Sequence, residues 1–375
     1  MADIIVIGGG IIGLSCAFRL ARLGFNVELY DRNTLDSSNK KGATQASLGA
    51  MWPPSPSKRG PYYDFFRASL DAIPGFISEI SLFANQSIYF SQCGSIELLK
   101  TQAQHEAAKL EVEDSSKLSG TWKDQIQLLS SEELKEYPFD FNDTFYGAIY
   151  CRRTSSVSVP ELTLSLIQAL KNLNVKINDT DKIISLRISK SKIDGVISEK
   201  NGFKSCPIVV VAAGHLSSQL DTSINQSALI KPVKGESLIL KMNHDIDVII
   251  KKAPYYLVPI SKEFIGVGAT TEKGDNHDEA TTVAARQKLY AAAIDMIPKL
   301  KNATIFKSMA GFRPMSTHRK PCLGPIPEVF GLFLASGHYK TAFSLAPVTA
   351  QYISDLILDR PVEYDLSKFA PTIKN

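Results

Sequence analysis

The hydrophobic and polar positions at the start of the chain predict a strand, a helix and a second strand in close succession. Residues 3–7 form an apolar run that suits a strand buried on both faces. Apolar residues then recur at helical spacing over 11–23, and residues 26–30 again have the pattern of a strand. We therefore expect a βαβ unit near the N-terminus.

The same two periodicities continue along the chain. They predict helices over residues 62–83, 102–117, 159–172, 282–296 and about 346–358. They predict strands over residues 95–99, 208–212, 237–241, 264–268 and 332–336. Ser158 and Pro160 suit the N-cap and the first turn of the helix at 159–172. Nucleotide-type strand-to-helix turns near both ends, with different material between them, indicate one lobe inserted into another.

Composition narrows the class of protein. A chain of 375 residues exceeds the length at which one hydrophobic core usually suffices, which favours two lobes. The 42 basic and 38 acidic residues leave a net charge of +4 without a basic stripe, so no nucleic-acid partner is expected. No apolar run reaches the roughly 18 residues of a membrane span, and no cleavable leader pattern is present. We therefore expect a cytoplasmic protein with no integral membrane segment.

The five cysteines indicate neither disulfides nor a metal centre. They lie far apart and include no Cys-x-x-Cys pair, the positions being Cys16, Cys93, Cys151, Cys206 and Cys322. Disulfide frameworks and zinc sites have more regular spacing. We expect no bound metal.

The turn after the first strand has the spacing of a dinucleotide-binding loop. Gly8, Gly10 and Gly13 fit the pattern GxGxxG. The first glycine permits a tight turn, the second lets a pyrophosphate approach the backbone, and the third allows the helix to pack on the strand. The following helix begins where its N–H groups can bind phosphate. Leu14 stands where a Walker A loop carries lysine, which argues against an ATPase.

Asp31 completes the nucleotide pattern at the end of the second strand. A carboxylate at this position accepts hydrogen bonds from ribose hydroxyls. Its negative charge repels a 2'-phosphate, so we expect an adenosine with a free ribose. The loop and this residue do not distinguish NAD from FAD.

Further segments, taken in order along the chain, resemble the D-amino acid oxidase family of FAD-dependent oxidoreductases. The resemblance is strongest to its glycine oxidase branch, which serves thiamine biosynthesis, and it covers essentially the full length. The segments are GATQASLGAMWPP (42–54), QCGSIELL (92–99), SSVSVPEL (155–162), IVVVAAGHLS (208–217), KPVKGESLIL (231–240), YYLVPISKEFIGVGATT (255–271), AGFRPMSTHRKPCLGPIP (310–327) and GHYKTAFSLAPVTA (337–350).

The resemblance implies an α/β fold with a Rossmann-type FAD-binding domain and an inserted substrate domain built on an antiparallel sheet. The FAD-binding domain is expected over residues 1–85, 149–229 and 312–375, and the substrate domain over residues 86–148 and 230–311. Relatives that attach FAD covalently carry a cysteine where this chain has Gly311, so noncovalent FAD is expected. Family members are often oligomers, so a homo-oligomer is also an expectation.

The resemblance also assigns residues to the cofactor. They are Gly8, Gly10, Ile11, Ile12, Gly13, Asp31, Arg32, Thr44, Gln45, Ser47, Gly49, Met51, Ile183, Ala213, Gly214, Gly337, His338, Tyr339, Lys340, Thr341 and Ala342. Pro347 has the position of a helix start, and the N-terminus of that helix is expected to face the edge of the flavin that becomes negative on reduction.

Arg313, Tyr256 and Lys340 are the candidates for a direct role in the reaction. In the family a substrate amine lies against the flavin and its Cα hydride passes to flavin N5, so the protein mainly places the substrate. Arg313 is expected to bind the substrate carboxylate through two parallel donors, and Tyr256 to donate to the same group. Tyr255 alternates to the other face of its strand and is expected to pack.

Lys340 stands where glycine oxidases carry arginine, and its role stays open. It keeps the charge but lacks the planar fork of donors. It can pair with a substrate carboxylate, line the entrance or face solvent. His318 and Thr271 also depart from the glycine oxidase pattern and indicate a larger, more polar or more acidic substrate than glycine. His215 is expected to be a packing or surface residue.

The leading interpretation is FAD-dependent oxidation of glycine or another small amino acid or amine, with oxygen as acceptor and hydrogen peroxide as product. A D-amino acid dehydrogenase that passes electrons to a quinone or carrier is the first alternative, and a specialised biosynthetic oxidase is another. An NAD-dependent dehydrogenase and a non-catalytic FAD-binding protein are further alternatives.

Overall fold

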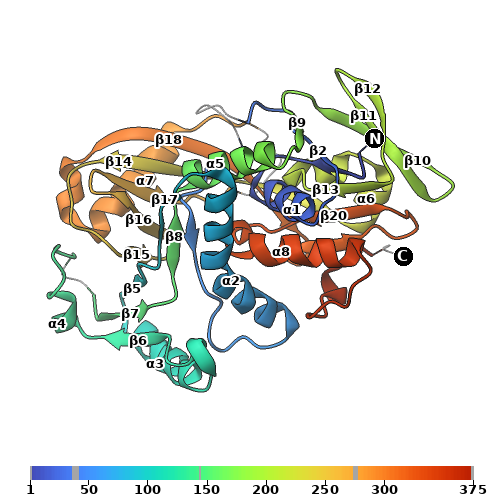
Figure 1. Ribbon diagram of the computed structural model, residues 1–375. Helices are drawn as coiled ribbons and strands as arrows, with labels where there is room; N and C mark the ends of the chain where they lie inside the picture. Colours follow the sequence, from blue (N-terminus) through green and yellow to red (C-terminus); the bar gives the residue numbers. More distant parts are fainter. Residues whose placement is uncertain (1, 36–41, 143–144, 273–277, 373–375) are drawn as a thin grey trace.

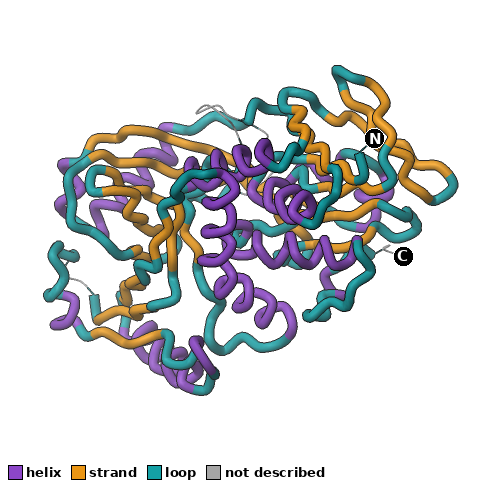
Figure 2. Tube along the Cα trace, viewed as in Figure 1, coloured by secondary structure: helices purple, strands orange, loops and turns teal. Residues whose placement is uncertain are grey.

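The computed structural model describes residues 2–35, 42–142, 145–272 and 278–372. Within these ranges the strands form two large sheets, of six and eight strands, and two small sheets of three. The two large sheets lie at opposite ends of the molecule, with the long helices α1, α2, α5 and α8 packed beside the six-stranded sheet (Figure 1). The tube view shows strands at both ends of the molecule, with helices between them (Figure 2).

The six-stranded sheet contains the predicted βαβ unit. Strand β1 (Ile4–Ile7) is fully buried and pairs in parallel with β2 (Val27–Tyr30) and with β13 (Ile208–Val211). Helix α1 (Ile11–Arg22) connects β1 to β2. The order of the sheet is β19-β20-β13-β1-β2-β9. The outer strands are β9 (Lys176–Asn178), β20 (Leu332–Ser336) and the antiparallel β19 (Cys322–Pro325).

Four helices form the main core with this sheet. Helix α1 packs against α8 (Ala342–Ile357) and α5 (Val159–Asn172), and both of these also pack against α2 (Pro61–Ala84). Phe18 of α1 is buried among the aromatic rings of α2, with Phe76 at 6.3 Å and Phe83 at 5.9 Å between centroids. This apolar packing holds the glycine-rich turn at the start of α1 in place.

The eight-stranded sheet is mostly antiparallel, and its order is β18-β14-β17-β16-β15-β5-β7-β6. Its longest pair is β14 (Ile230–Lys241) and β18 (Thr304–Ser316). The other strands are β17 (Phe264–Gly268), β16 (Tyr255–Ser261), β15 (Ile249–Lys252), β5 (Ser95–Leu99), β7 (Gly147–Cys151) and β6 (Ile126–Leu129). Helix α7 (Val283–Met296) packs against β14, β16 and β17.

The remaining elements are short. One small sheet has the order β3-β8-β4, with β3 (Ala50–Met51), β8 (Ser155–Val157) and β4 (Phe90–Ser91). The other is β10 (Ile183–Ser189), β11 (Lys192–Ser198) and β12 (Gly202–Ser205). The remaining α-helices of the described chain are α3 (Gln102–Ser116), α4 (Ser131–Leu134) and α6 (Thr222–Ser227).

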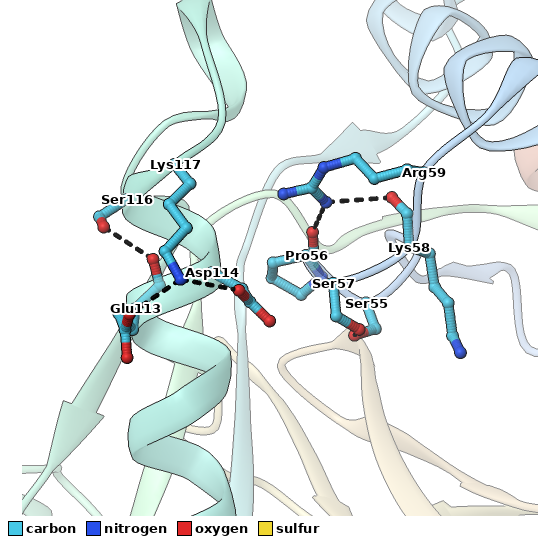
Figure 3. A network of polar contacts seen from close by, with 9 residues as sticks. All are labelled: Ser55, Pro56, Ser57, Lys58, Arg59, Glu113, Asp114, Ser116 and Lys117. Carbon is cyan, nitrogen blue, oxygen red and sulfur yellow. Dashed lines mark hydrogen bonds and ion pairs between the residues drawn. The ribbon is translucent and has the colours of Figure 1, made fainter.

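The segment between β3 and α2 lies beside α3 (Figure 3). Arg59 turns back on this segment and donates to the carbonyl oxygens of Pro56 and Lys58. Ser55 donates from its hydroxyl to Glu111 of α3 over 3.1 Å, and on α3 itself Glu113 pairs with Lys117 over 2.8 Å. The segment that leads into α2 is thus attached to α3.

Most predicted elements are confirmed. The strands at 95–99, 264–268 and 332–336 and the helix at 159–172 have the predicted bounds, while the strand at 237–241 is the second half of β14. The prediction that Pro347 starts the last helix is wrong, because α8 already begins at Ala342 and Pro347 lies inside it. Ser158 has the N-cap position of α5, but its side chain makes no capping hydrogen bond.

The last boundary of the predicted domain division, between residues 311 and 312, lies inside a strand. Strand β18 runs through position 312 without interruption and stays paired with β14 on both sides of it. The division remains a proposal. In the part of the chain that the structure describes, no helix is both long enough and apolar enough to cross a bilayer.

Candidate active site

One cavity of about 510 Å³ extends from the glycine-rich turn to the eight-stranded sheet. At one end it is lined by Gly8, Gly10 and Asp31, and at the other by Tyr256 and Arg313. The cavity therefore connects the predicted nucleotide end with the predicted substrate end.

The glycine-rich turn is as tight as its sequence predicts. Gly8 has φ +109°, and a Cβ there would overlap the carbonyl oxygen of Ala212 on the neighbouring strand. A Cβ at Gly13 would overlap the carbonyl oxygen of Gly8, so α1 begins in direct contact with the turn. Both positions require glycine for packing, and Gly10 remains open to the cavity.

Thr44 caps the helix that follows this turn. The N-cap residue Gly10 has no side chain, and the Ile11 N–H donates instead to Thr44 Oγ1 over 3.0 Å. Because Thr44 belongs to the second predicted cofactor loop, this bond fixes the two loops relative to each other. The hydroxyl hydrogen of Thr44 remains able to donate to a phosphate oxygen.

Asp31 is held by the backbone around it. Its carboxylate accepts from Gly9 N over 2.6 Å and from Asn33 N over 2.7 Å, which orders the end of β2 beside the turn. The neighbouring Arg32 forms a 3.1 Å ion pair with Glu279, which comes from the segment before α7. Both members of this pair line the cavity.

Arg313 and Tyr256 lie together at the other end. Arg313 donates from Nη1 to the carbonyl oxygen of Thr270 over 3.0 Å, and burial lowers its pKa. Burial raises the pKa of Tyr256, an effect that the positive charge of Arg313 opposes. Trp52 packs edge-on against Tyr256, with 5.6 Å between ring centroids. Tyr255 packs against the core of the eight-stranded sheet, as predicted.

Lys340 lines the same cavity, from the loop between β20 and α8. It is exposed as a whole residue, and its Nζ lies 5.3 Å from the ring centroid of Tyr339. Desolvation lowers the pKa of Lys340, and the charge of Arg313 lowers it further. Among the described residues neither Arg313 nor Lys340 has a carboxylate within ion-pair distance.

The loop that carries Lys340 is ordered by His338. The imidazole is buried and its Nε2 lies 3.0 Å from Thr349 Oγ1, while burial lowers the pKa of His338 to about 3. Thr341 donates from its hydroxyl to the His338 carbonyl over 2.8 Å, and Tyr339 N donates to Pro314 O over 2.8 Å. The loop is thereby attached to β18, and α8 begins at its end.

The structure brings most of the predicted site residues to this cavity. Those that line it are Gly8, Gly10, Ile11, Ile12, Asp31, Arg32, Thr44, Gln45, Ser47, Ile183, Ala213, Gly214, Tyr256, Arg313, His338, Tyr339, Lys340 and Ala342. The predicted residues outside the lining are Gly13, Gly49, Met51, Gly337 and Thr341. Gly49, for example, packs against the backbone next to the cavity, because a Cβ there would overlap the carbonyl oxygen of Val157.

Two predicted specificity residues do not line the cavity. Thr271 is exposed, so the prediction that it shapes the pocket is wrong, and the adjacent Thr270 contacts Arg313 instead. Both residues lie after the end of β17, and only the fold brings the carbonyl of Thr270 to Arg313. His318 is exposed on a turn after β18 and also lies outside the lining.

Sequence reasoning missed several lining residues, including Trp52, Gly235, Phe312 and Glu279. His215 also lines the cavity, where its ring lies 5.2 Å from that of Phe312. Trp52 lies within the second predicted cofactor segment, 42–54, and could have been found from that position. No sequence pattern around Glu279 indicates a role at the cavity, because only the fold brings this residue to Arg32.

The match to a known family decides the identity of this site. Residues 3–356 match the DAO family, described as FAD dependent oxidoreductase. The chain belongs to this family. It is an FAD-dependent oxidoreductase, and the family resemblance found in its sequence is confirmed.

Individual relatives are distant but match along their whole length. The glycine oxidase of Geobacillus kaustophilus is 26% identical over 99% of this chain and 96% of the relative. The hydrogen cyanide synthase subunit HcnC of Pseudomonas aeruginosa is 24% identical over 98% of this chain and 95% of the relative. A crystal structure of the Geobacillus kaustophilus glycine oxidase has a TM-score of 0.91 and 24% identity, covering 100% of this chain and 99% of that one. This structural likeness confirms the mixed α/β fold.

The residues at the nucleotide end fit FAD. The turn leaves the backbone of Gly8 and Gly10 open to the cavity at the start of α1, where a diphosphate has N–H donors. Asp31 offers the carboxylate that a ribose needs, because each of its oxygens keeps a further acceptor site. The same cavity continues from these residues to Arg313.

Proposed function

We propose that this protein oxidises glycine or another small amino acid at the bond between Cα and nitrogen. Oxygen is the acceptor and hydrogen peroxide a product, so one amino acid, one oxygen and one water give an oxo acid, ammonia and peroxide. The observation that carries this proposal is the placement of Arg313, which has no acidic partner among the described residues, together with Tyr256 at the far end of the cavity.

Arg313 and Tyr256 are proposed to bind the substrate carboxylate. A guanidinium stays charged even where burial lowers its pKa, and it offers donors in the geometry of a carboxylate. The bond to Thr270 O engages one donor of Nη1 and leaves the other nitrogens free to bind substrate. Because burial raises the pKa of Tyr256, its hydroxyl keeps the proton that it donates.

The bound carboxylate places the substrate amine and Cα within the cavity. FAD, when bound, supplies the acceptor for the hydride that leaves Cα. The protein contributes orientation, and Trp52, Tyr256 and Phe312 exclude water from the substrate end. The amine must be neutral to release hydride. No carboxylate lines the substrate end among the described residues, so no negative side chain there favours the ammonium form.

Noncovalent binding of FAD is part of the proposal. Gly311 lies against Ala43 and Ala46 of the second cofactor loop, and a Cβ there would come within 2.9 Å of the Ala46 Cβ. Cys322 is buried on β19 outside the cavity lining, and burial raises its pKa to about 12. Neither position offers a reactive thiol to the flavin. We also propose that residues 1–85, 149–229 and 312–375 hold FAD while 86–148 and 230–311 form the substrate domain.

Oxygen consumption by the purified, FAD-loaded protein tests this function. Glycine and a series of small D- and L-amino acids are supplied, and peroxide is measured with a peroxidase dye. The proposal expects equal amounts of oxygen consumed and peroxide formed with at least one of them. Turnover with a soluble quinone but not with oxygen would instead assign the chain to the dehydrogenases.

A further inference from the structure

Gly235 lies directly against the guanidinium of Arg313. On β14 it is the register partner of Gly311, and Arg313 follows two residues later on β18, so its side chain projects from the same face. A Cβ at Gly235 would overlap Nη1, Cζ and Nη2 of Arg313. The guanidinium therefore fills the space that a side chain at position 235 would occupy.

Gly268 has the same relationship with Tyr256. The two residues are register partners on β17 and β16. A Cβ at Gly268 would overlap Cζ of the tyrosine ring and lie 2.6 Å from its hydroxyl oxygen. The ring therefore lies across the backbone of the neighbouring strand.

The two contacts are directed toward each other. The strand order is β18-β14-β17-β16, so Arg313 leans from the first strand over the second and Tyr256 leans from the fourth over the third. The two glycine-bearing strands, β14 and β17, are direct neighbours. The guanidinium and the phenol ring consequently lie over the two central strands of this group, although their Cα atoms are on its outer strands, and the charge of Arg313 acts on the pKa of Tyr256.

Backbone conformation does not account for these glycines. Neither Gly235 nor Gly268 is among the residues with positive φ, so another residue could adopt either conformation. Glycine inside a strand lowers the stability of the sheet, and it commonly marks a close approach by another group. The group that approaches is in both cases a residue of the proposed carboxylate site.

We propose that Gly235 and Gly268 are positioning residues, whose missing side chains bring Arg313 and Tyr256 together as one carboxylate-binding pair. This inference rests on the proposed function, since it takes the substrate carboxylate as the ligand of that pair. An added methyl group at either position displaces one member, and the two groups then no longer reach the same carboxylate.

Acetate binding to the FAD-loaded protein tests this proposal without requiring turnover. Acetate carries the carboxylate alone, and its binding is followed by the change in the flavin absorption spectrum. We expect Gly235→Ala and Gly268→Ala each to raise the dissociation constant of acetate by at least about tenfold while the FAD content stays unchanged. Acetate affinity within about twofold of the wild type in both variants would overturn the proposal.

Gly266→Ala is the matched control. Gly266 lies on β17 two residues before Gly268, and a Cβ there would meet only the flexible end of the Leu48 side chain among its nearest atoms. We expect its acetate affinity to stay within about twofold of the wild type. A loss as large as in Gly268→Ala would show that any methyl on this face has the effect, and would overturn the proposal.

A double variant separates positioning from a general loss of structure. In an Arg313→Ala background the group that clashes is absent, so Gly235→Ala should weaken acetate binding no further and should restore FAD content if the single variant loses it. A full additional loss in the double variant would overturn the inference. Arg313→Ala alone tests the proposed function independently, because unchanged acetate affinity in that variant would exclude Arg313 as the carboxylate ligand.

Discussion

Arg313 donates a hydrogen bond from Nη1 to the carbonyl oxygen of Thr270 over 3.0 Å. The bond joins β18 to the residue that follows β17 by two positions, and it fixes the guanidinium at the substrate end of the cavity. Because the described part of the chain gives Arg313 no acidic partner, its charge is left for a ligand.

Replacing Arg313 with alanine should therefore remove most of the transition-state stabilisation that depends on the carboxylate. Removing the guanidinium leaves the substrate carboxylate without its charged partner, which corresponds to roughly a 10²- to 10³-fold decrease in kcat/KM. Arg313→Lys keeps the charge without the fork and should recover only part of the loss. Steady-state kinetics with matched FAD content measure the effect, and equal kcat/KM in the lysine variant and the wild type would contradict a bidentate role.

Tyr256→Phe should have a smaller effect of the same kind. The substitution removes one hydrogen bond to a charged group, which corresponds to an increase in KM of roughly 10- to 100-fold. Packing against Trp52 is preserved because the ring remains. Thermal unfolding should be nearly unchanged, and a KM equal to that of the wild type would remove Tyr256 from the carboxylate site.

Asp31→Ala should weaken FAD binding. The carboxylate holds Gly9 and Asn33 and also lines the cavity, so its loss loosens the turn and removes the acceptor for ribose. We expect the FAD dissociation constant to rise by at least about tenfold. Asp31→Glu is the control, since glutamate keeps the charge, and equal FAD affinity in the alanine variant would contradict the assignment.

Acetate affinity should fall at high pH if Lys340 contributes to the carboxylate site. Burial and Arg313 lower the pKa of Lys340, so its positive charge is lost at a lower pH than that of an ordinary lysine. Acetate itself stays ionised throughout this range. Titration of acetate binding from neutral to alkaline pH should show a weakening that Lys340→Arg removes, and an identical profile in both proteins would exclude Lys340 from the site.

Burial of His338 should make the fold sensitive to acid. Its pKa is lowered to about 3 in the folded protein, whereas the unfolded chain binds this proton below about pH 6.5. Stability that is fully present above pH 6.5 is therefore lost as the pH falls toward 3, by up to about 1.4 kcal/mol per pH unit.

His338→Gln tests this linkage because glutamine does not titrate. Urea unfolding at pH 7 and pH 5 should give a smaller difference in the free energy of unfolding for the variant than for the wild type. The same difference in both proteins would show that the acid sensitivity has another source.

The sequence predicted the nucleotide half of the site more fully than the substrate half. Gly8, Gly13 and Asp31 are close in sequence, and local turn geometry dictates their residue types, so spacing was sufficient to find them. The bond between Thr44 and Ile11 joins residues 33 positions apart and follows from no local pattern.

The contacts of Arg313 show why the rest was not predictable from sequence. Its neighbours Gly235 and Thr270 come from other strands, and only the sheet register brings them together. Thr271 was assigned to the pocket from the family resemblance alone, and only the fold shows that Thr270 contacts Arg313. The position of Pro347 was also predicted wrongly. Proline is typical of the first turn of a helix, but α8 begins five residues earlier, at Ala342.

Anaerobic reduction of the flavin tests the central claim most directly. The FAD-loaded protein is mixed with glycine, other small amino acids and simple amines in the absence of oxygen, and absorption of the oxidised flavin is recorded. We expect at least one amino acid to bleach the flavin, and we expect Arg313→Ala to keep its FAD but lose this reduction at the same amino acid concentration. A flavin that no amino acid or amine reduces, or one reduced equally in Arg313→Ala, would contradict it.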